Sequence, residues 1–288
     1  METVPSAYLV PTDQSFSVNN APTAPPNSAP DKRACKAVLK ENVKAIAELQ
    51  RVMYAQDKYS LLLVFQAMDA AGKDGTIRKV LSGVNPAGCQ VYSFKAPSKE
   101  ELDHDFLWRT AVRLPERGRI GVFNRSYYEE VLVVRVRPEF LGGQNLPDPP
   151  ALDQLWTQRF ESIQHWEKHL VRNGTLVMKF WLNVSRAEQH RRFRRRIDEQ
   201  RSNWKFNGGD VEESERWEQY MEAYDQMLKA TSTPDAPWYA IPADNKSFMR
   251  MTVSSLIRQR LETMNLSYPE LPASELAELQ AYRSRLLP

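Results

Sequence analysis

Short apolar runs alternate with amphipathic segments through most of the chain. Continuous apolar runs, which are typical of strands buried on both faces, occupy residues 60–66, 90–96, 119–124, 175–184 and 237–244. Apolar residues spaced three and four apart predict helices over residues 36–56, 76–84, 101–114, 130–136, 153–173 and 247–264. This alternation predicts an α/β fold, a parallel sheet with helices on both faces. Ligands of such sheets bind beyond the carboxyl ends of the strands, where we expect four segments to meet: 66–76, 95–97, 124–130 and 184–190.

Two segments interrupt the alternation. Residues 1–30 contain six prolines among Ser, Thr and Asn, which excludes a helix or a central strand. We expect either a disordered tail or an extended arm laid on a neighbour, where Tyr8, Leu9, Val10 and Phe16 could dock. Residues 185–232 are strongly charged and predict two helices, over 190–201 and 215–228, with a turn at 207–209. The chain thus divides into an arm, 1–30, and a domain, 31–288, which carries the charged insertion and ends in a proline-punctuated tail.

Composition narrows the classes of function. The 288 residues include 39 Lys and Arg against 36 Asp and Glu, so no global positive field indicates a nucleic-acid partner, and any basic site must be local. Cys35 and Cys89 are too few for a disulfide framework or a zinc site. The longest aliphatic run, residues 61–64, is too short to span a bilayer, and no secretory signal is visible. We therefore expect a cytoplasmic protein without a membrane partner.

Residues 65–76 read FQAMDAAGKDGT, which matches a phosphate-binding loop except at two positions. Ala67 stands where the pattern G-x-x-x-x-G-K-[ST] has its first glycine, and Asp74 stands where it has a hydroxyl. Gly72 would let backbone N–H groups point inward, the following helix would add its positive end, and Lys73 would place a full charge on the phosphates. The residues assigned to phosphate binding are Ala70, Ala71, Gly72, Lys73, Asp74, Gly75 and Thr76, the last as a hydroxyl at the helix start.

Asp69 is the informative departure within this loop. A carboxylate that faces a polyanion is repulsive unless a cation stands between them, and magnesium would bridge Asp69 to phosphate oxygens. The alternative is a solvated turn after a strand. The strand before the loop and the helix after it favour phosphate binding.

A second polar cluster, FNRSYYEE, ends the strand at 119–124. Asn124 occupies the strand end where nucleotide kinases hold magnesium or its water, although an amide would do so weakly. Arg125 can clamp a phosphate through two hydrogen bonds. Glu129 and Glu130 follow. Each could belong to the site or could be a structural residue favoured by the N-terminus of a helix, and we prefer the structural interpretation for Glu130.

Arginines are concentrated in the segment HRRFRRRIDEQR. Charged helices are usually solvated and intersperse acidic residues for pairing, but here the acidic residues only flank the cluster. Phe193 and Ile197 would anchor the helix to the core. The arrangement predicts a lid whose arginines close on a transferring phosphate.

These motifs together resemble the polyphosphate kinase 2 family, over nearly all of residues 36–266. The resemblance is carried by LLLVFQAMDAAGKDGTIRKVLSGVNPAG, SFKAPSKEELDHDFLWR, RGRIGVFNRSYYEEVLVVRV and NWKFNGGDVEESERWEQYMEAY, followed by WYAIPADNK. In that family the loop is a variant of the Walker A motif. The resemblance therefore implies a P-loop kinase fold with a helical, arginine-rich lid.

The resemblance also implies the substrates and their sites. The donor would be inorganic polyphosphate, the nucleotides AMP, ADP and ATP, and the metal Mg²⁺, with Mn²⁺ as an alternative. Catalytic roles fall on Asp69, Lys73, Arg125, Arg192 and Arg196, and the polyanion channel on Lys95, Lys205 and Lys246. The acceptor nucleotide would contact Asn124, Arg125 and Glu129, and the metal would be held by Asp69 and Glu129, directly or through water.

The chain departs from many family members at two positions, where they have Asp for Asn124 and Asn for Glu129. The sequence N-R-S-Y-Y-E resembles the subgroup that phosphorylates both AMP and ADP. We therefore expect a reversible polyphosphate-dependent nucleotide kinase that forms a homo-oligomer, a dimer or a tetramer. One alternative is an ATP-dependent nucleoside monophosphate kinase of thymidylate kinase type, which would not need so long a basic run. Another is a P-loop nucleic-acid binder, for which the sequence lacks a basic and aromatic stacking platform.

Overall fold

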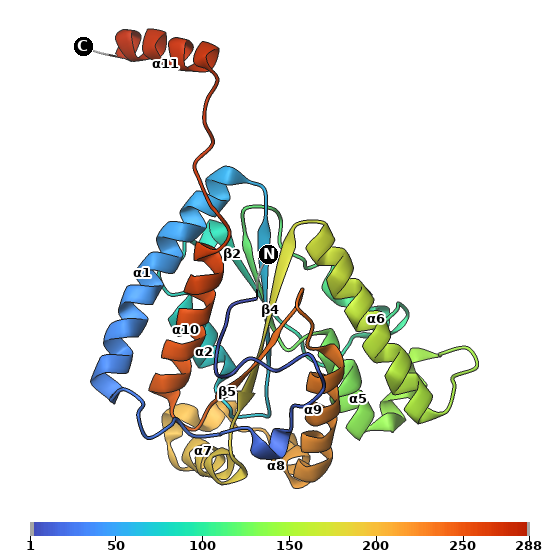
Figure 1. Ribbon diagram of the computed structural model, residues 1–288. Helices are drawn as coiled ribbons and strands as arrows, with labels where there is room; N and C mark the ends of the chain where they lie inside the picture. Colours follow the sequence, from blue (N-terminus) through green and yellow to red (C-terminus); the bar gives the residue numbers. More distant parts are fainter. Residues whose placement is uncertain (1–2, 287–288) are drawn as a thin grey trace.

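The computed structural model describes residues 3–286, so the outermost residues of the predicted arm and domain (1, 2, 287 and 288) lie outside it (Figure 1). A five-stranded, wholly parallel sheet has the strand order β2-β3-β1-β4-β5. The strands are β1 Ser60–Gln66, β2 Cys89–Ser93, β3 Ile120–Asn124, β4 Thr175–Asn183 and β5 Trp238–Pro242. Each predicted strand is present, which confirms the predicted α/β class.

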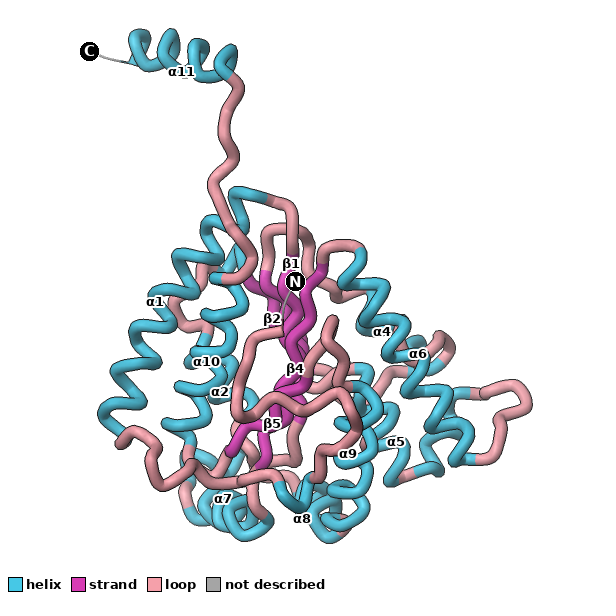
Figure 2. Tube along the Cα trace, in the orientation of Figure 1, coloured by secondary structure: helices cyan, strands magenta, loops and turns pink. Residues whose placement is uncertain are grey.

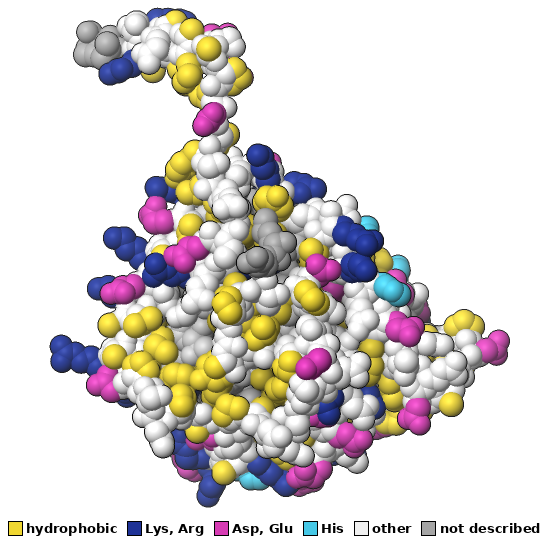
Figure 3. All heavy atoms as spheres, in the orientation of Figure 1, with side chains coloured by type: hydrophobic (Ala, Val, Ile, Leu, Met, Phe, Trp, Pro, Cys, Tyr) yellow, Lys and Arg dark blue, Asp and Glu magenta, His cyan; other side chains and the backbone are white. Residues whose placement is uncertain are grey.

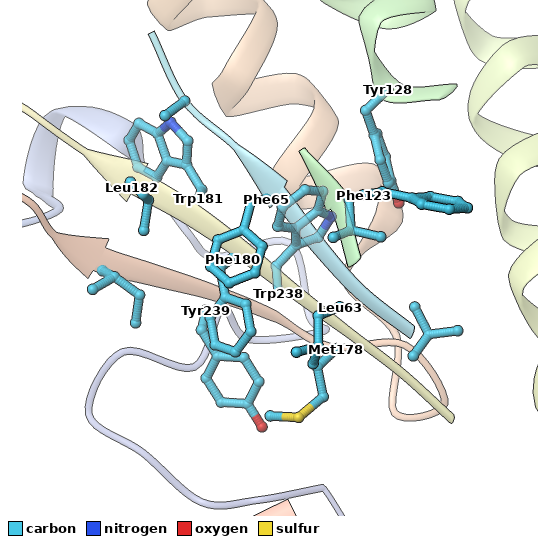
Figure 4. Close-up of a cluster of buried hydrophobic side chains, with 14 of the residues drawn as sticks. Leu63, Phe65, Phe123, Tyr128, Met178, Phe180, Trp181, Leu182, Trp238 and Tyr239 are labelled. Atoms are coloured by element: carbon cyan, nitrogen blue, oxygen red, sulfur yellow. The ribbon is translucent and has the colours of Figure 1, made fainter. Parts of the chain in front are cut away.

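Aromatic side chains in register hold the centre of the sheet together. Phe65 on β1 lies beside Phe180 on β4, which lies beside Tyr239 on β5 (Figure 4). The ring centroids are 5.0 and 5.8 Å apart, and both pairs are stacked. Side chains alternate across a strand, so the neighbouring positions of β4 face the opposite layer of helices.

Helices cover both faces of the sheet (Figures 1 and 2). One layer contains α1 Lys32–Gln56, α2 Lys73–Val80 and α10 Lys246–Glu262. The other contains α5 Val133–Val136, α6 Leu152–Arg172 and α9 Trp217–Thr231. The Asp31 side chain caps α1 by accepting a hydrogen bond from the Ala34 N–H at 2.7 Å.

Two predicted helices are wrong in detail. The segment 101–114 forms only two short helices, α3 Lys99–Leu102 and α4 Trp108–Ala111. Between them the Asp105 carboxylate accepts a hydrogen bond from the Leu107 N–H, which competes with a continuous helix. The segment 130–136 is divided between a 3-10 helix, Tyr127–Val131, and α5. Its valines are β-branched, which lowers their helix propensity.

The charged insertion lies across the carboxyl ends of the strands (Figure 1). It consists of α7 Arg186–Asp198, a 3-10 helix Gln200–Lys205, α8 Gly208–Glu215 and then α9. The predicted turn at 207–209 is the start of α8, because the Asn207 side chain caps it. Phe193 is buried as expected, but Ile197 is 53 % exposed and does not anchor the helix.

The N-terminal segment is an extended arm, but it packs on its own domain rather than on a neighbour as the sequence analysis expected. Leu9 forms an antiparallel bridge with Tyr239, and the Val10 N–H donates to the Trp238 carbonyl at 2.9 Å. Val4, Val10 and Val18 are buried in the core. The arm thus covers the edge of β5 that would otherwise expose unpaired backbone groups.

The C-terminal tail holds a helix that the sequence analysis did not predict. Helix α11, Ala273–Leu286, projects from the amino-terminal end of the sheet on an extended linker (Figure 1). Hydrophobic side chains lie on its exposed surface (Figure 3), among them Leu276, Leu279 and Tyr282, each about half exposed. None of the helices within residues 3–286 combines the length and apolar character needed to cross a membrane.

Candidate active site

The phosphate loop connects the buried end of β1 to the start of α2. Gly72 caps the helix with a φ of 111°, a left-handed conformation that favours glycine. Ala70 is also left-handed, with a φ of 61°. Left-handed residues in such a loop can turn N–H groups to one side of the chain. The helix that follows starts at Lys73, earlier than predicted.

Lys73 lies deep in this loop. Its ammonium group donates to the Ala67 carbonyl at 2.7 Å and contacts the Met68 carbonyl at 3.4 Å. Burial and the nearby Arg125 lower the pKa of Lys73 to about 8, against the opposing pull of Asp69. Thr76 does not supply a hydroxyl to the loop surface as expected, because it is fully buried and donates to the Gly72 carbonyl at 3.0 Å.

Arg125 joins the loop to the strand-end cluster. It follows β3 with a left-handed φ of 64°, and its N–H continues the sheet by donating to the Phe65 carbonyl. Its guanidinium pairs with the Asp69 carboxylate and, at 3.1 Å, with Glu129. Burial would raise the pKa of Asp69, but the charges of Lys73 and Arg125 outweigh it and hold that pKa below its ordinary value.

Asn124 contacts the loop through a different residue. Its amide group donates to the Asp74 carboxylate at 2.5 Å and to the Ser93 hydroxyl at 3.3 Å. The Asn124 Oδ1 atom is buried without a hydrogen-bond partner among residues 3–286. An acceptor oxygen is therefore free beside the carboxylates of the loop.

Side chains of helix α7 donate hydrogen bonds to the backbone of the phosphate loop. Gln189 donates to the Asp69 carbonyl at 3.0 Å. Arg192 is 6 % exposed and donates to four backbone carbonyls and to Glu188, namely Ala70 at 3.0 Å, Ala71 at 2.6 Å, Ala243 at 2.6 Å, Asp244 at 3.1 Å and the Glu188 carboxylate at 2.6 Å. A guanidinium has five N–H donors, so all are used. The expectation that Arg192 faces a transferring phosphate does not hold in this conformation.

Arg196, one turn further along α7, is placed differently. It is partly exposed and pairs with Asp210 of α8 at 3.2 Å. Its charge contributes to lowering the pKa of Asp69, which indicates that it lies near the loop. Burial raises the pKa of Asp210, and the negative charge of Asp69 adds to that rise. Asp210 is a site residue that the sequence analysis missed.

The three predicted channel lysines lie apart from one another. Lys95 is exposed and lines the cavity described below. Lys205 is exposed at the end of the 3-10 helix in the charged insertion, where its ammonium lies 4.9 Å from the centre of the Trp204 ring. Lys246 begins α10, where burial and the charges of Arg192, Arg195 and Arg250 lower its pKa to about 8. Of the three lysines, Lys246 is therefore the one whose charge is coupled to that of Arg192, which binds the loop backbone.

Oxygen donors at this site suit a hard divalent cation. Asp69 and Glu129 both contact Arg125, and the free Asn124 oxygen lies near the loop. Within residues 3–286, no group of three or more His, Cys, Asp or Glu side chains is arranged to hold a metal by itself. Hard divalent cations are commonly held by one or two carboxylates together with substrate phosphates.

A cavity of about 680 Å³ opens beside Arg125. Its lining combines charged residues, among them Lys95, Arg125 and Glu129, with apolar residues, among them Leu102, Phe106, Val133, Val134 and Phe140. Arg109 lies 5.2 Å above the Phe94 ring, and Arg159 lies 4.4 Å above Phe106. A molecule that carries both a phosphate and a planar ring would match this mixed lining.

Sequence reasoning did not find the cavity, because its walls come from separate segments without a common motif. It also missed Lys179 and Glu167, which form a buried ion pair at 2.6 Å behind the site. A lysine in the middle of the apolar run LVMKFWL was the available signal. Glu130 lies in the first turn of a 3-10 helix, where its carboxylate is bound by Arg159 and Gln144, contacts that the preferred interpretation did not foresee.

Comparisons with known proteins agree with this geometry. The family model described as polyphosphate kinase 2 matches residues 29–269. An ADP-polyphosphate phosphotransferase of Rhodopseudomonas palustris is 52% identical over 251 residues, covering 87% of each chain. An AMP/ADP-polyphosphate phosphotransferase of Meiothermus ruber is 41% identical over 239 residues, covering 83% of this chain and 85% of the relative.

A solved structure supports the same relationship. The crystal structure of polyphosphate kinase 2 from Arthrobacter aurescens superposes with a TM-score of 0.85 at 34% identity, covering 98% of this chain and all of the other. The similarity therefore extends through the sheet, the helical layers and the charged insertion.

Proposed function

The chain belongs to the polyphosphate kinase 2 family, and we propose that it transfers phosphoryl groups from inorganic polyphosphate to AMP and ADP. One observation carries the assignment of the site: Arg125 contacts both Asp69 of the phosphate loop and Glu129 of the cavity. Donor phosphates on the loop and an acceptor phosphate in the cavity would therefore meet at one guanidinium. A P-loop kinase fold with a parallel sheet supports this arrangement.

The reaction exchanges one phosphoanhydride bond for another. A terminal phosphate oxygen of the nucleotide attacks the terminal phosphorus of polyphosphate, a new P–O bond forms, and the bridging P–O bond of the donor breaks. The shortened chain leaves, and the reverse reaction follows the same path. Because both reactants are polyanions, catalysis consists mainly of positioning and charge neutralisation.

Each site residue has a role in this reaction. Lys73 and the loop residues Ala70, Ala71, Gly72, Asp74, Gly75 and Thr76 shape the donor site, and Lys95, Lys205 and Lys246 guide the rest of the polyanion. Arg125 and Arg196 neutralise the transferring group, and Arg192 holds the loop in shape. Asn124 and Glu129 face the acceptor. Asp69 does not need to remove a proton, because nucleotide phosphates are already largely ionised at neutral pH.

Enzymes of this family use a divalent metal ion, and we assign Mg²⁺, with Mn²⁺ as a substitute. Asp69 and Glu129 would hold it, directly or through water, together with phosphate oxygens. When bound, the ion would neutralise phosphate charge between the two substrates.

The remaining assignments concern the whole protein. Residues 185–232 act as a lid over the carboxyl ends of the strands. The enzyme is a homo-oligomer, a dimer or a tetramer, and the apolar face of α11 supports such contacts. Its substrates are nucleotides and polyphosphate, which places its activity in the cytoplasm.

The test is a time course of AMP, ADP and ATP after AMP is mixed with polyphosphate and Mg²⁺, with ATP excluded as donor. We expect ADP first and then ATP. Untouched AMP beside converted ADP would limit the enzyme to ADP. Phosphorylation with ATP but not with polyphosphate would instead favour the nucleoside monophosphate kinase.

Two variants link this assay to the site. Lys73→Met should lower kcat/KM on the order of 10²–10³-fold in a folded protein, because it removes the central phosphate cation. Glu129→Asn should narrow the acceptor range, since an amide coordinates a metal or its water more weakly than a carboxylate. Wild-type-like turnover of Lys73→Met would overturn the loop assignment, and unchanged AMP and ADP steps in Glu129→Asn would overturn the role of Glu129.

A further inference from the structure

An ion pair is buried in the core directly behind the acceptor cavity. Lys179 lies in the middle of β4 and Glu167 lies on α6, with side chains 0% and 1% exposed and Nζ and Oε2 2.6 Å apart. Burial lowers the pKa of Lys179 to about 8 and raises that of Glu167. Both shifts reflect the cost of keeping charged groups away from water.

The pair is part of a closed hydrogen-bond network. The Lys179 ammonium donates to Glu167, to the Tyr128 hydroxyl at 2.8 Å and to the Thr231 carbonyl at 2.7 Å. The second Glu167 oxygen accepts from the Tyr127 hydroxyl at 2.9 Å and from the Tyr128 hydroxyl at 2.8 Å. All three ammonium protons and both carboxylate oxygens are therefore used.

Stability alone is a weak reason for such a network. Well-packed apolar residues of similar volume often replace a buried ion pair without loss of stability, and sometimes with a gain. The surroundings are already suited to apolar packing, since the Lys179 ammonium lies 5.3 Å from the Tyr128 ring and 5.2 Å from the Trp238 ring. The Tyr128 and Trp238 rings themselves meet edge to face (Figure 4).

The two tyrosines connect the network to the acceptor site. They lie between Arg125 and Glu129, in the 3-10 helix that follows β3. The Ser126 hydroxyl accepts from the Tyr128 N–H at 3.2 Å, which fixes the start of that helix. Arg125 itself has a left-handed backbone, a conformation that its surroundings must hold in place.

We propose that Lys179 and Glu167 are positioning residues for the acceptor: through the Tyr127 and Tyr128 hydroxyls they fix the turn that aims Arg125 and Glu129 at the cavity. The ion pair touches no substrate and acts only through the two tyrosines. Each hydroxyl anchors one of two successive residues, so the turn can neither rotate nor slide. The donor loop is held mainly by α7, through Gln189 and Arg192, and it meets this network only through the Arg125–Asp69 pair.

The decisive variant makes the whole network apolar: Lys179→Met, Glu167→Leu, Tyr127→Phe and Tyr128→Phe together. Because no buried charge is left unpaired, we expect it to fold with a Tm close to that of the wild type. KM for ADP should rise on the order of tenfold to a hundredfold, while KM for polyphosphate should rise by a clearly smaller factor, because the loop keeps its hydrogen bonds to α7. A folded variant with wild-type KM for ADP, or with equal rises for both substrates, would overturn the proposal.

A milder variant keeps the test valid if the fourfold change prevents folding. Tyr127→Phe with Tyr128→Phe removes only the two hydroxyls, and the same split between the two KM values is expected. Tyr239→Phe is the matched control, because it removes a buried hydroxyl that binds the Val4 carbonyl, away from the turn. Unchanged KM values in the double variant, or the same split in Tyr239→Phe, would contradict the positioning role.

This inference rests on the proposed acceptor site, and the experiment separates the two. The wild-type enzyme is assayed first with ADP and polyphosphate. No transfer by the wild type would refute the proposed function. Transfer by the wild type with unchanged variants would refute only the positioning role.

Discussion

Lys73 and Arg125 are the two cations nearest the bound phosphates in the proposed site, and each already has protein partners. Lys73 donates to backbone carbonyls of its own loop, whereas Arg125 is paired with two carboxylates. The Lys73 ammonium has three protons and two carbonyl partners, Ala67 and Met68, so one proton remains to bind a phosphate. A guanidinium stays charged at any physiological pH, but the buried ammonium does not.

The pH dependence of donor binding follows from this difference. Lys73 has a pKa of about 8, so its positive charge is present below that pH and is lost as the pH rises through it. KM for polyphosphate should be constant from pH 6.5 to about 7.5 and then rise toward tenfold per pH unit, with about one proton involved. Steady-state kinetics across this range are the measurement.

Lys246 has a similar pKa and must be separated from Lys73. Lys246→Arg keeps the positive charge at all pH values and serves as the control. The rise in donor KM should persist in this variant. Its disappearance there would assign the titration to Lys246 rather than to Lys73.

At the scale of elements, α7 serves two functions along its length. Its first half is bonded to the phosphate loop through Gln189 and Arg192, whereas its second half carries Arg196 toward α8. The part of the proposed lid that can move without disturbing the loop is therefore the part that follows Arg192. Arginines on one helix should then have different effects when they are replaced.

Three single substitutions test that division. Arg192→Gln should lower the free energy of unfolding by about 3–5 kcal/mol as well as kcat, because a buried, fully bonded charge is lost. Arg196→Gln should lower kcat on the order of a hundredfold with little change in Tm. Arg194→Gln, on the exposed face, should resemble the wild type. Thermal unfolding and steady-state kinetics distinguish these outcomes, and equal effects at all three positions would indicate a diffuse basic surface.

Elements with a continuous signal were predicted well from sequence. The strands β1, β3 and β4 are buried on both faces, so most residues in each are apolar, and their limits agree with prediction to within one residue. The single helix predicted over 101–114 was wrong because the Asp105 side chain accepts a hydrogen bond from the backbone, a local effect that periodicity does not reveal. The phosphate loop was found because its residues are contiguous. The cavity depends on distant segments that only the fold brings together. The same holds for the partners of Arg192, whose five N–H donors are all used.

At the scale of the whole molecule, the two ends of the chain differ in how they relate to the body. The N-terminal arm buries three valines and pairs with β5, so it belongs to the core. Helix α11 presents its apolar side chains to solvent. A helix of this length is marginal in water unless its apolar face is covered.

Deletion of residues 1–24 should destabilise the monomer. The loss of Val4, Val10 and Val18 removes roughly 1.5–3 kcal/mol for each buried side chain, and the edge of β5 becomes exposed. We expect a clear fall in Tm, measured by thermal unfolding, while the residual folded fraction still phosphorylates ADP because no proposed site residue lies in the arm. An unchanged Tm would contradict the packing of the arm.

Charge on the face of α11 should change the assembly without changing the fold. Leu276→Glu with Leu279→Glu should lower the molar mass measured by light scattering and leave the Tm within a few degrees. Glu278→Gln, on the same helix, is the control for altered charge alone. Retention of the full molar mass by the double variant would exclude α11 from the oligomer contact.

The pairing of the arm with β5 also has a consequence during synthesis. Tyr239 and Val4 are 235 positions apart, so at ~5–20 residues per second the arm waits roughly 10–50 s on the ribosome for its partner strand. During that interval its apolar residues can meet other nascent chains. Pro5 and Pro11 leave only five residues between them, fewer than the six or seven that a cross-β segment requires. These two prolines thus keep residues 6–10, which later pair with β5, from forming a cross-β segment before β5 emerges.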